Sequence, residues 1–200
     1  MTKRAYFSFE IKKSISAQLE ESASLTLRVA HEAVDTICSM AELVIESHRQ
    51  NGTLFICGNG GSAAGAQHLA GEMVGRFLRE REPLRCIALT TDTSVLTAIG
   101  NDYGYEEIFG RQVLAHGREG DVLLALSTSG NSPNVLKAVE RARRLKMKVI
   151  ALSGKGGGRL ARAADFCVTV PSDVSPRIQE VHETIGHILC FLIEQSLFEK

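Results

Sequence analysis

The sequence predicts an α/β fold: a three-layer α/β/α sandwich around a five-stranded parallel sheet of flavodoxin-like order, with an N-terminal helical extension. Five short apolar runs follow residue 53, and helix-like segments separate them. This alternation is typical of parallel strands covered by helices on both faces. The first fifty residues contain no glycine or proline and show the three- and four-residue apolar spacing of helices.

The N-terminal region predicts one or two long helices that end near Asn51-Gly52. Its regularly spaced apolar residues are Leu25, Val29, Ala33, Ile37, Met40 and Val44. We expect a single domain over residues 1–200, in which 1–52 serve oligomerisation and 53–200 form the α/β core. The alternative, that these helices only wrap the same domain, stays open.

The order of the strands positions the ligand site. The predicted strands are 53–57, 84–89, 122–126, 148–152 and 166–170, and the helix-like segments are 62–81, 106–116, 132–146, 158–164 and 176–197. In the flavodoxin-like order 2-1-3-4-5, strands one and three are neighbours at the switch point where ligands bind. We therefore expect the loops after these two strands to face each other across one crevice.

Composition excludes some function classes. The 23 basic residues balance 23 acidic residues, so nothing supports a nucleic-acid or membrane-surface role. The five cysteines form no C-x-x-C pair, which argues against a disulfide framework and for a reducing compartment. No apolar run approaches 18 residues, and the N-terminus does not resemble a signal peptide. We expect a cytoplasmic protein.

The stretch FICGNGGSAAGAQHLAGE reads as a strand, a glycine turn and a helix. Gly58, Gly60 and Ala63 match the spacing of a dinucleotide fingerprint. That fingerprint also needs an acidic residue at the end of the next strand. The next strand ends at Leu89, and Asp92 follows too late, inside a predicted threonine-rich loop. The glycine spacing alone therefore does not indicate a dinucleotide site, and a tight strand-to-helix turn that uses glycine for steric reasons stays the alternative.

A second strand, loop and helix occurs in ALSTSGNSPNVLKAVE. Ser132 is a predicted N-cap, and Pro133 suits the first helical position. Four hydroxyl residues gather near the positive end of this helix, namely Ser127, Thr128, Ser129 and Ser132. Hydroxyls and free backbone N–H groups at such a position form an anion site suited to a terminal phosphate. Two loops of this kind suit a small phosphorylated molecule better than a dinucleotide.

Two helices carry candidate chemistry. His68 and Glu72 lie one turn apart in the helix that follows the glycine loop. Helical spacing in RIQEVHETIGH places Gln179 and His187 about 80° apart, whereas His182 lies about 140° from His187. HETIGH is not the metalloprotease motif H-E-x-x-H, because its second histidine comes one residue late.

Several segments together resemble one known family. They are CGNGGSAAGAQHLAGEMVGRF, GNDYGYEEIFGRQV, GREGDVLLALSTSGNSPNVLKA, MKVIALSGKGGG and RIQEVHETIGHIL. The chain resembles the sugar isomerase (SIS) family, and most closely the phosphoheptose isomerases. The resemblance implies conversion of sedoheptulose 7-phosphate into D-glycero-D-manno-heptose 7-phosphate through an enediol, for bacterial heptose in lipopolysaccharide or other surface polysaccharide. It also implies zinc and a homotetramer whose active sites lie between subunits.

The resemblance further implies roles by motif position. Glu72 would be the general base and His187 its acid partner. The implied substrate contacts are Asn59, Gly60, Gly61, Ser62, Glu72, Asn101, Asp102 and Gln179, with Ser127, Thr128, Ser129 and Ser132 at the phosphate. The implied zinc ligands are His68, Glu72, Gln179 and His187.

A rival hypothesis is a non-catalytic adaptor of the same fold that binds the replication initiator protein. SAAGAQH and TDTSVLTAI are similar to that adaptor. The adaptor lacks the acid/base pair, whereas Glu72 and His187 are both present here. The sequence therefore favours the enzyme. A third hypothesis, a sugar-phosphate-sensing regulator, would bring a DNA-binding domain, and the sequence shows none.

Overall fold

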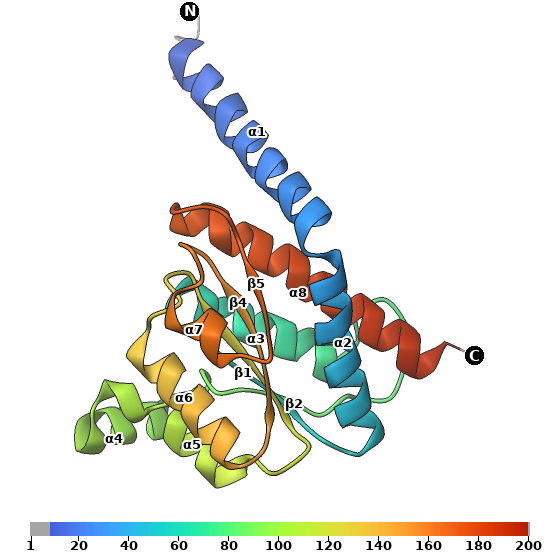
Figure 1. The fold of residues 1–200 in the computed structure, drawn as a ribbon, viewed down its shortest axis with the longest axis vertical. Coiled ribbons are helices and arrows are strands. Elements are labelled where there is room, and N and C mark those ends of the chain that lie inside the picture. Colours follow the sequence, from blue (N-terminus) through green and yellow to red (C-terminus); the bar gives the residue numbers. More distant parts are fainter. Residues whose placement is uncertain (1–8, 200) are drawn as a thin grey trace, which may run out of the picture.

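The sheet has the predicted topology. The structure, a computed structural model, describes residues 9–199. Its strands are β1 Leu54–Cys57, β2 Cys86–Ala88, β3 Val122–Ser127, β4 Lys148–Ser153 and β5 Phe166–Thr169. They pair in parallel in the order β2-β1-β3-β4-β5 (Figure 1), which confirms the predicted flavodoxin-like order.

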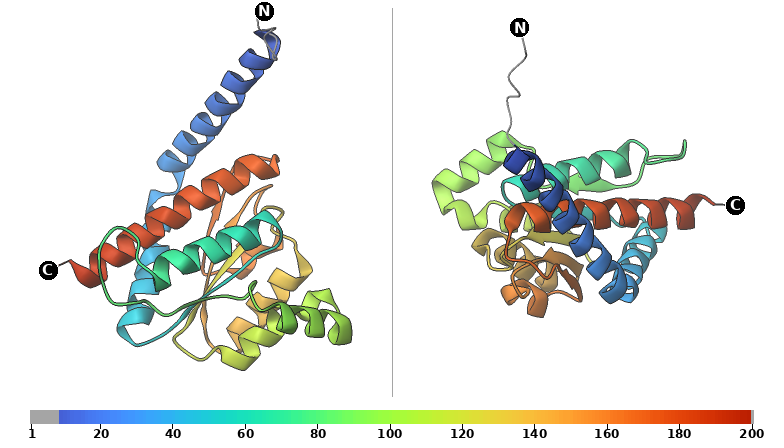
Figure 2. Two further views of the ribbon diagram at one scale, coloured as in Figure 1. Left: turned by 180° about the vertical axis from the view of Figure 1, so that it is seen from behind. Right: turned by 90° about the horizontal axis from the view of Figure 1, so that it is seen from above.

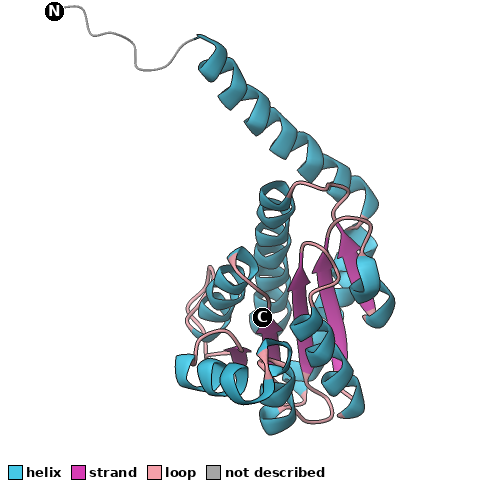
Figure 3. Cartoon of the chain, turned by 90° about the vertical axis from the view of Figure 1, so that its left-hand side faces the viewer, coloured by secondary structure: helices cyan, strands magenta, loops and turns pink. Residues whose placement is uncertain are grey.

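Helices cover both faces of this sheet (Figure 3). They are α1 Phe9–Glu32, α2 Val34–Arg49, α3 Gly61–Val74, α4 Thr93–Tyr103, α5 Gly110–His116, α6 Pro133–Arg144, α7 Gly158–Ala163 and α8 Ser175–Phe198, with a 3-10 turn at Tyr105–Glu107. Alternate strand residues face opposite layers. Leu54 and Ile56 pack in the core that includes α2, α3 and α8, whereas Phe55 and Cys57 pack in the core that includes α5 and α6.

Helix α1 extends away from the body of the domain (Figures 1 and 2). Leu25 and Val29 are its buried residues, while Ile15, Leu19 and Leu27 are exposed. Exposed apolar side chains of this kind suit a subunit interface. The assignment of residues 1–52 to oligomerisation stays a prediction, and residues 1–8 and 200 of the predicted domain lie outside the described residues.

Two predicted elements differ from the structure. The helix predicted over 62–81 ends at Val74, because the backbone N–H groups after it bind Glu194 instead of continuing the helix. The segment around Asp92, predicted as a loop, begins helix α4, and the Asp92 carboxylate caps it by accepting from the Val95 N–H. Within residues 9–199, no helix has the length and apolarity needed to cross a membrane.

Candidate active site

The two predicted ligand loops follow the carboxyl ends of β1 and β3. These strands are hydrogen-bonded neighbours, with Cys57 paired to Ala125, so the loops that follow them start side by side. The first loop turns through Gly60 at a φ of 54° before α3 begins at Gly61. A β-carbon on Gly61 would lie 2.6 Å from Nε2 of Gln179, so the glycine lets α8 bring this amide to the loop.

The loop after β3 gathers hydroxyl groups. Ser127 Oγ lies 3.1 Å from Ser132 Oγ and 3.5 Å from Ser129 Oγ. Ser129 Oγ accepts from the Asn131 N–H, and Thr128 lies partly exposed between these serines. These groups stand at the N-terminus of α6, where a helix dipole favours an anion. Ser132 is the residue before α6 as predicted, but its side chain makes no cap bond and binds Ser127 instead.

A pair of asparagines joins the two loops. Asn59 Nδ2 donates to Asn134 Oδ1, and Asn134 Nδ2 donates to Asn59 Oδ1, both at 2.8 Å. Tyr105 donates its hydroxyl to the same Asn59 oxygen. Asn134 is buried at the start of α6, so it fixes the orientation of the Asn59 amide in the first loop.

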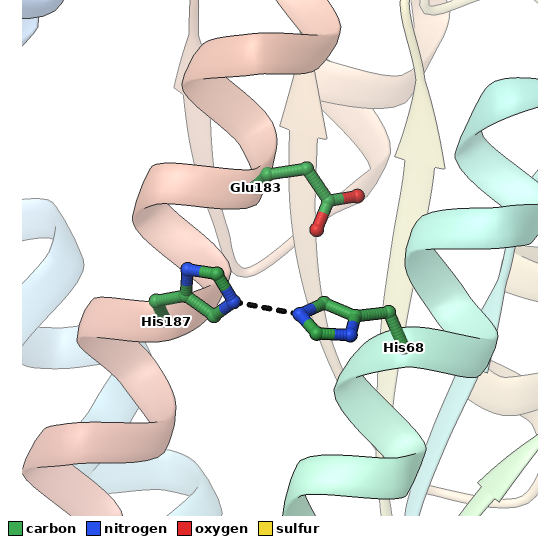
Figure 4. A group of neighbouring side chains, drawn as sticks. All are labelled: His68, Glu183 and His187. Atoms are coloured by element: carbon green, nitrogen blue, oxygen red, sulfur yellow. Dashed lines mark hydrogen bonds between the residues drawn. The ribbon is translucent and has the colours of Figure 1, made fainter. Parts of the chain in front are cut away.

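The predicted acid/base and metal residues of α3 and α8 approach one another. His68 Nε2 lies 2.7 Å from His187 Nε2 and 3.8 Å from Glu72 Oε1. Glu183, one turn before His187 on α8, completes a group with the two histidines (Figure 4). One ligand atom from each of these three side chains lies within 4.8 Å of the others.

Neighbouring side chains support this arrangement. The Phe77 ring stacks on His187, with centroids 5.8 Å apart and planes 27° apart. On α8, burial is the main cause that raises the pKa of the Cys190 thiol to about 12, and the negative charge of Glu72 adds to it. Gly186 allows close approach of the two helices, since a β-carbon there would lie 2.6 Å from a Leu69 methyl.

The donor set fits zinc. Two imidazoles and a carboxylate are ligands that zinc prefers. Two nitrogens on one tetrahedral zinc lie about 3.3 Å apart, given Zn–N distances of about 2.0 Å. The 2.7 Å separation of His68 and His187 would therefore open slightly on binding. Of the other predicted ligands, Glu72 lies near His68, and Gln179 lies against Gly61.

Some residues are placed differently from the rest of the set. Ser62 is buried in the first turn of α3. Asn101 and Asp102 lie exposed on α4, where the amide of Asn101 donates to the Asp102 carboxylate. His182 faces the sheet and binds the Ser153 carbonyl, in agreement with the predicted angle between it and His187.

Sequence reasoning missed Glu183, Asn134 and Tyr105 as site residues. Glu183 had a signal, since it precedes His187 by four residues and so shares its helix face. Asn134 lies in the quoted loop but resembles an ordinary first-turn residue. Tyr105 reaches Asn59 only through tertiary packing, so its position in the sequence does not reveal this contact.

Comparison with known proteins agrees with this geometry. A family model described as "SIS domain" matches residues 19–154. The phosphoheptose isomerase of Rhodospirillum rubrum is 52% identical over 187 residues, which cover 94% of this chain and 99% of the relative. Phosphoheptose isomerase 2 of Campylobacter jejuni is 52% identical over 170 residues, covering 84% of this chain and 85% of the relative.

Solved structures give the same result. The phosphoheptose isomerase of Neisseria gonorrhoeae matches with a TM-score of 0.88 and 43% identity, covering 92% of this chain and 99% of that one. The phosphoheptose isomerase of Francisella tularensis matches with a TM-score of 0.89 and 41% identity, covering 94% of this chain and 100% of that one.

Proposed function

Because the chain belongs to the phosphoheptose isomerases of the SIS family, we propose that it interconverts sedoheptulose 7-phosphate and D-glycero-D-manno-heptose 7-phosphate. It is an aldose–ketose isomerase, and its substrate is a small sugar phosphate. The observation that carries the proposal is the chain of contacts in which His68 lies between Glu72 and His187, at 3.8 Å and 2.7 Å.

The reaction explains why these residue types are needed. Moving a carbonyl between C1 and C2 requires removal of a carbon-bound proton, an enediol, and return of the proton to the neighbouring carbon. Glu72 transfers the proton at carbon, since a carboxylate can act as a general base. His187 moves protons at the oxygens, because histidine is the side chain most often used as a general acid or base.

The substrate is held by the two loops. The hydroxyls of Ser127, Ser129 and Ser132, with Thr128 beside them, bind the phosphate at the N-terminus of α6. The sugar contacts are the remaining predicted residues, namely Asn59, Gly60, Gly61, Ser62, Asn101, Asp102 and Gln179. Asn134 supports them by fixing Asn59.

A zinc ion is the proposed cofactor. His68 and His187 would hold it with a carboxylate, and the candidates are the predicted Glu72 and the neighbouring Glu183. Gln179 is the predicted fourth ligand. When bound, zinc would stabilise negative charge on the enediolate oxygen.

Assembly, location and pathway are also proposals. Exposed apolar residues on α1 support a homotetramer in which active sites are shared between subunits. Five free cysteines support a cytoplasmic location. The product would supply heptose for bacterial surface polysaccharide. The single domain of residues 1–200 is part of the same proposal.

The test is turnover of sedoheptulose 7-phosphate by the purified protein, with and without zinc. Glu72→Gln should abolish turnover, since an amide cannot take the proton. Glu119→Gln is the matched control, because Glu119 is exposed at the opposite end of the sheet. If the wild type is active and the Glu72→Gln variant turns over at a similar rate, Glu72 is not the base.

The adaptor hypothesis would predict a folded protein without turnover that binds the replication initiator protein. None of the relatives named above supports it. Absence of turnover in the wild type under both conditions, from a folded assembly, would contradict the isomerase and make a binding assay with the initiator the next experiment.

A further inference from the structure

A buried ion pair lies behind the proposed active site. Arg81 Nε donates to Glu194 Oε2 at 2.9 Å, and the two side chains are only 1% and 3% exposed. Arg81 lies in the connection between α3 and β2, and Glu194 lies near the end of α8. A buried pair is costly unless further hydrogen bonds satisfy both groups.

Glu194 satisfies its oxygens with the turn that follows α3. It accepts from the backbone N–H groups of Phe77 at 3.1 Å, Leu78 at 2.9 Å and Arg79 at 2.9 Å. Burial opposes ionisation, but these bonds and the Arg81 guanidinium outweigh it and lower the pKa of Glu194. The charged carboxylate therefore fixes the path of this turn.

Three of the four remaining N–H groups of Arg81 donate to backbone carbonyls at and beyond the end of α3. Arg81 donates to the carbonyl oxygens of Glu72 and Met73, both at 2.9 Å, and to that of Glu82 at 3.0 Å. The last carbonyls of a helix have no partner within the helix. Arg81 thus caps α3 at the turn that carries Glu72.

The ion pair is therefore linked through hydrogen bonds to the backbone of Glu72 and to the residue that packs on His187. Arg81 holds the backbone of Glu72, while Glu194 holds the N–H of Phe77, whose ring stacks on His187. Neither charged group contacts the reactive atoms of Glu72 or His187. Helices α3 and α8, which the pair joins, lie side by side (Figure 2).

We propose that Arg81 and Glu194 are positioning residues, which hold both members of the acid/base pair in the reactive arrangement. This role rests on the proposed isomerase function. Buried networks with this many hydrogen bonds favour one geometry. A misplacement of about 1 Å in a catalytic group can lower the rate about 100-fold.

Four variants separate positioning from simple stability. Glu194→Gln replaces one carboxylate oxygen with an amide N–H₂ group, which cannot accept a hydrogen bond from a backbone N–H. Arg81→Lys keeps the charge but loses the planar fork that serves Glu194 and two helix carbonyls together. Phe77→Leu leaves the ion pair intact and removes only the ring against His187, and Phe77→Tyr restores the ring.

The kinetic result expected for Glu194→Gln, Arg81→Lys and Phe77→Leu is a kcat lower by about 10- to 100-fold with KM changed less than about twofold. Phe77→Tyr should recover most of kcat. A purely structural pair would lower the melting temperature while the folded protein kept the wild-type kcat. That outcome would overturn the proposal.

A second readout does not depend on turnover. In protein with ¹⁵N-labelled histidine, Glu194→Gln should shift the ring resonances of His68 and His187 but not of exposed His116. Unchanged ring resonances of His187 in the folded Glu194→Gln variant would overturn the positioning role. This holds even if the proposed substrate is wrong. A wild-type protein without turnover would contradict the isomerase proposal, and this result is independent of the histidine resonances.

Discussion

His68 Nε2 and His187 Nε2 face each other at 2.7 Å, although their residues are 119 positions apart in the sequence. At this distance one nitrogen donates and the other accepts, so the two rings cannot both be protonated at these atoms without repulsion. A metal cation in place of the shared proton would be bound by the lone pairs of both nitrogens. The arrangement is therefore suited to bind a metal between α3 and α8.

The first prediction concerns that metal. His68→Ala or His187→Ala should weaken zinc binding by at least about 10-fold, since loss of even an outer partner costs about that much. The measurement is competition with a chromophoric chelator, which requires no turnover. His116→Ala, an exposed change on α5, is the control and should leave the affinity unchanged.

The same titration identifies the carboxylate ligand. If Glu183 is the ligand, Glu183→Gln will weaken binding more than Glu72→Gln, and the reverse order will assign Glu72. Zinc affinity that no histidine variant alters would contradict a site between these helices.

The second prediction concerns the phosphate. Replacing Ser127 and Ser129 with alanine should chiefly raise KM, because each hydrogen bond to a charged group contributes about 1.5–3 kcal/mol. The expected rise is about 10-fold or more. Ser196→Ala, on the far end of α8, is the matched control. An unchanged KM in the double variant would remove these serines from the phosphate site.

The sequence predicted the sheet and the two ligand loops because their signals are local. Apolar runs identify the buried strands, and glycine and serine clusters identify the loops. The close approach of His68 and Glu72 also follows from helical spacing alone. The position of His187 opposite them rested on the resemblance, since spacing within one helix does not reveal its neighbour.

What could not be predicted depends on long-range contacts. Nothing local shows that Glu194 takes the N–H groups of residues 77–79, so the early end of α3 was missed. The helix at 93–103 was missed because its threonines and asparagine favour loops, although Asp92 provided a capping signal. Ser132 was predicted to cap α6, but a neighbouring hydroxyl competes for it.

The third prediction is a pH dependence of stability. Burial lowers the pKa of His182 to about 4, although its bond to the Ser153 carbonyl opposes this shift. The unfolded chain, in which the pKa is about 6.5, binds a proton between these values. The stability from neutral His182 is therefore complete above pH 6.5 and is lost as pH falls toward 4.

His182→Gln should remove this dependence, because glutamine can donate to the same carbonyl without titrating. Urea unfolding at pH 7, 6 and 5 measures it, and the wild type should lose up to about 1.4 kcal/mol more per pH unit than the variant. Half-buried His48, whose pKa is also lowered by burial, contributes equally to both proteins and cancels in the comparison. Parallel slopes for the two proteins would contradict a buried neutral His182.

The last prediction concerns assembly. Helix α1 leaves Ile15 and Leu19 exposed beyond the body of the domain, so these side chains gain stability only if another surface covers them. Leu19→Glu would place a charge in that contact and should convert the proposed tetramer to smaller species in analytical ultracentrifugation. Glu20→Lys, an exposed charge change on the next residue, controls for the altered charge. If sites are shared between subunits, turnover will fall with the tetramer fraction, and full activity in a Leu19→Glu monomer would contradict shared sites.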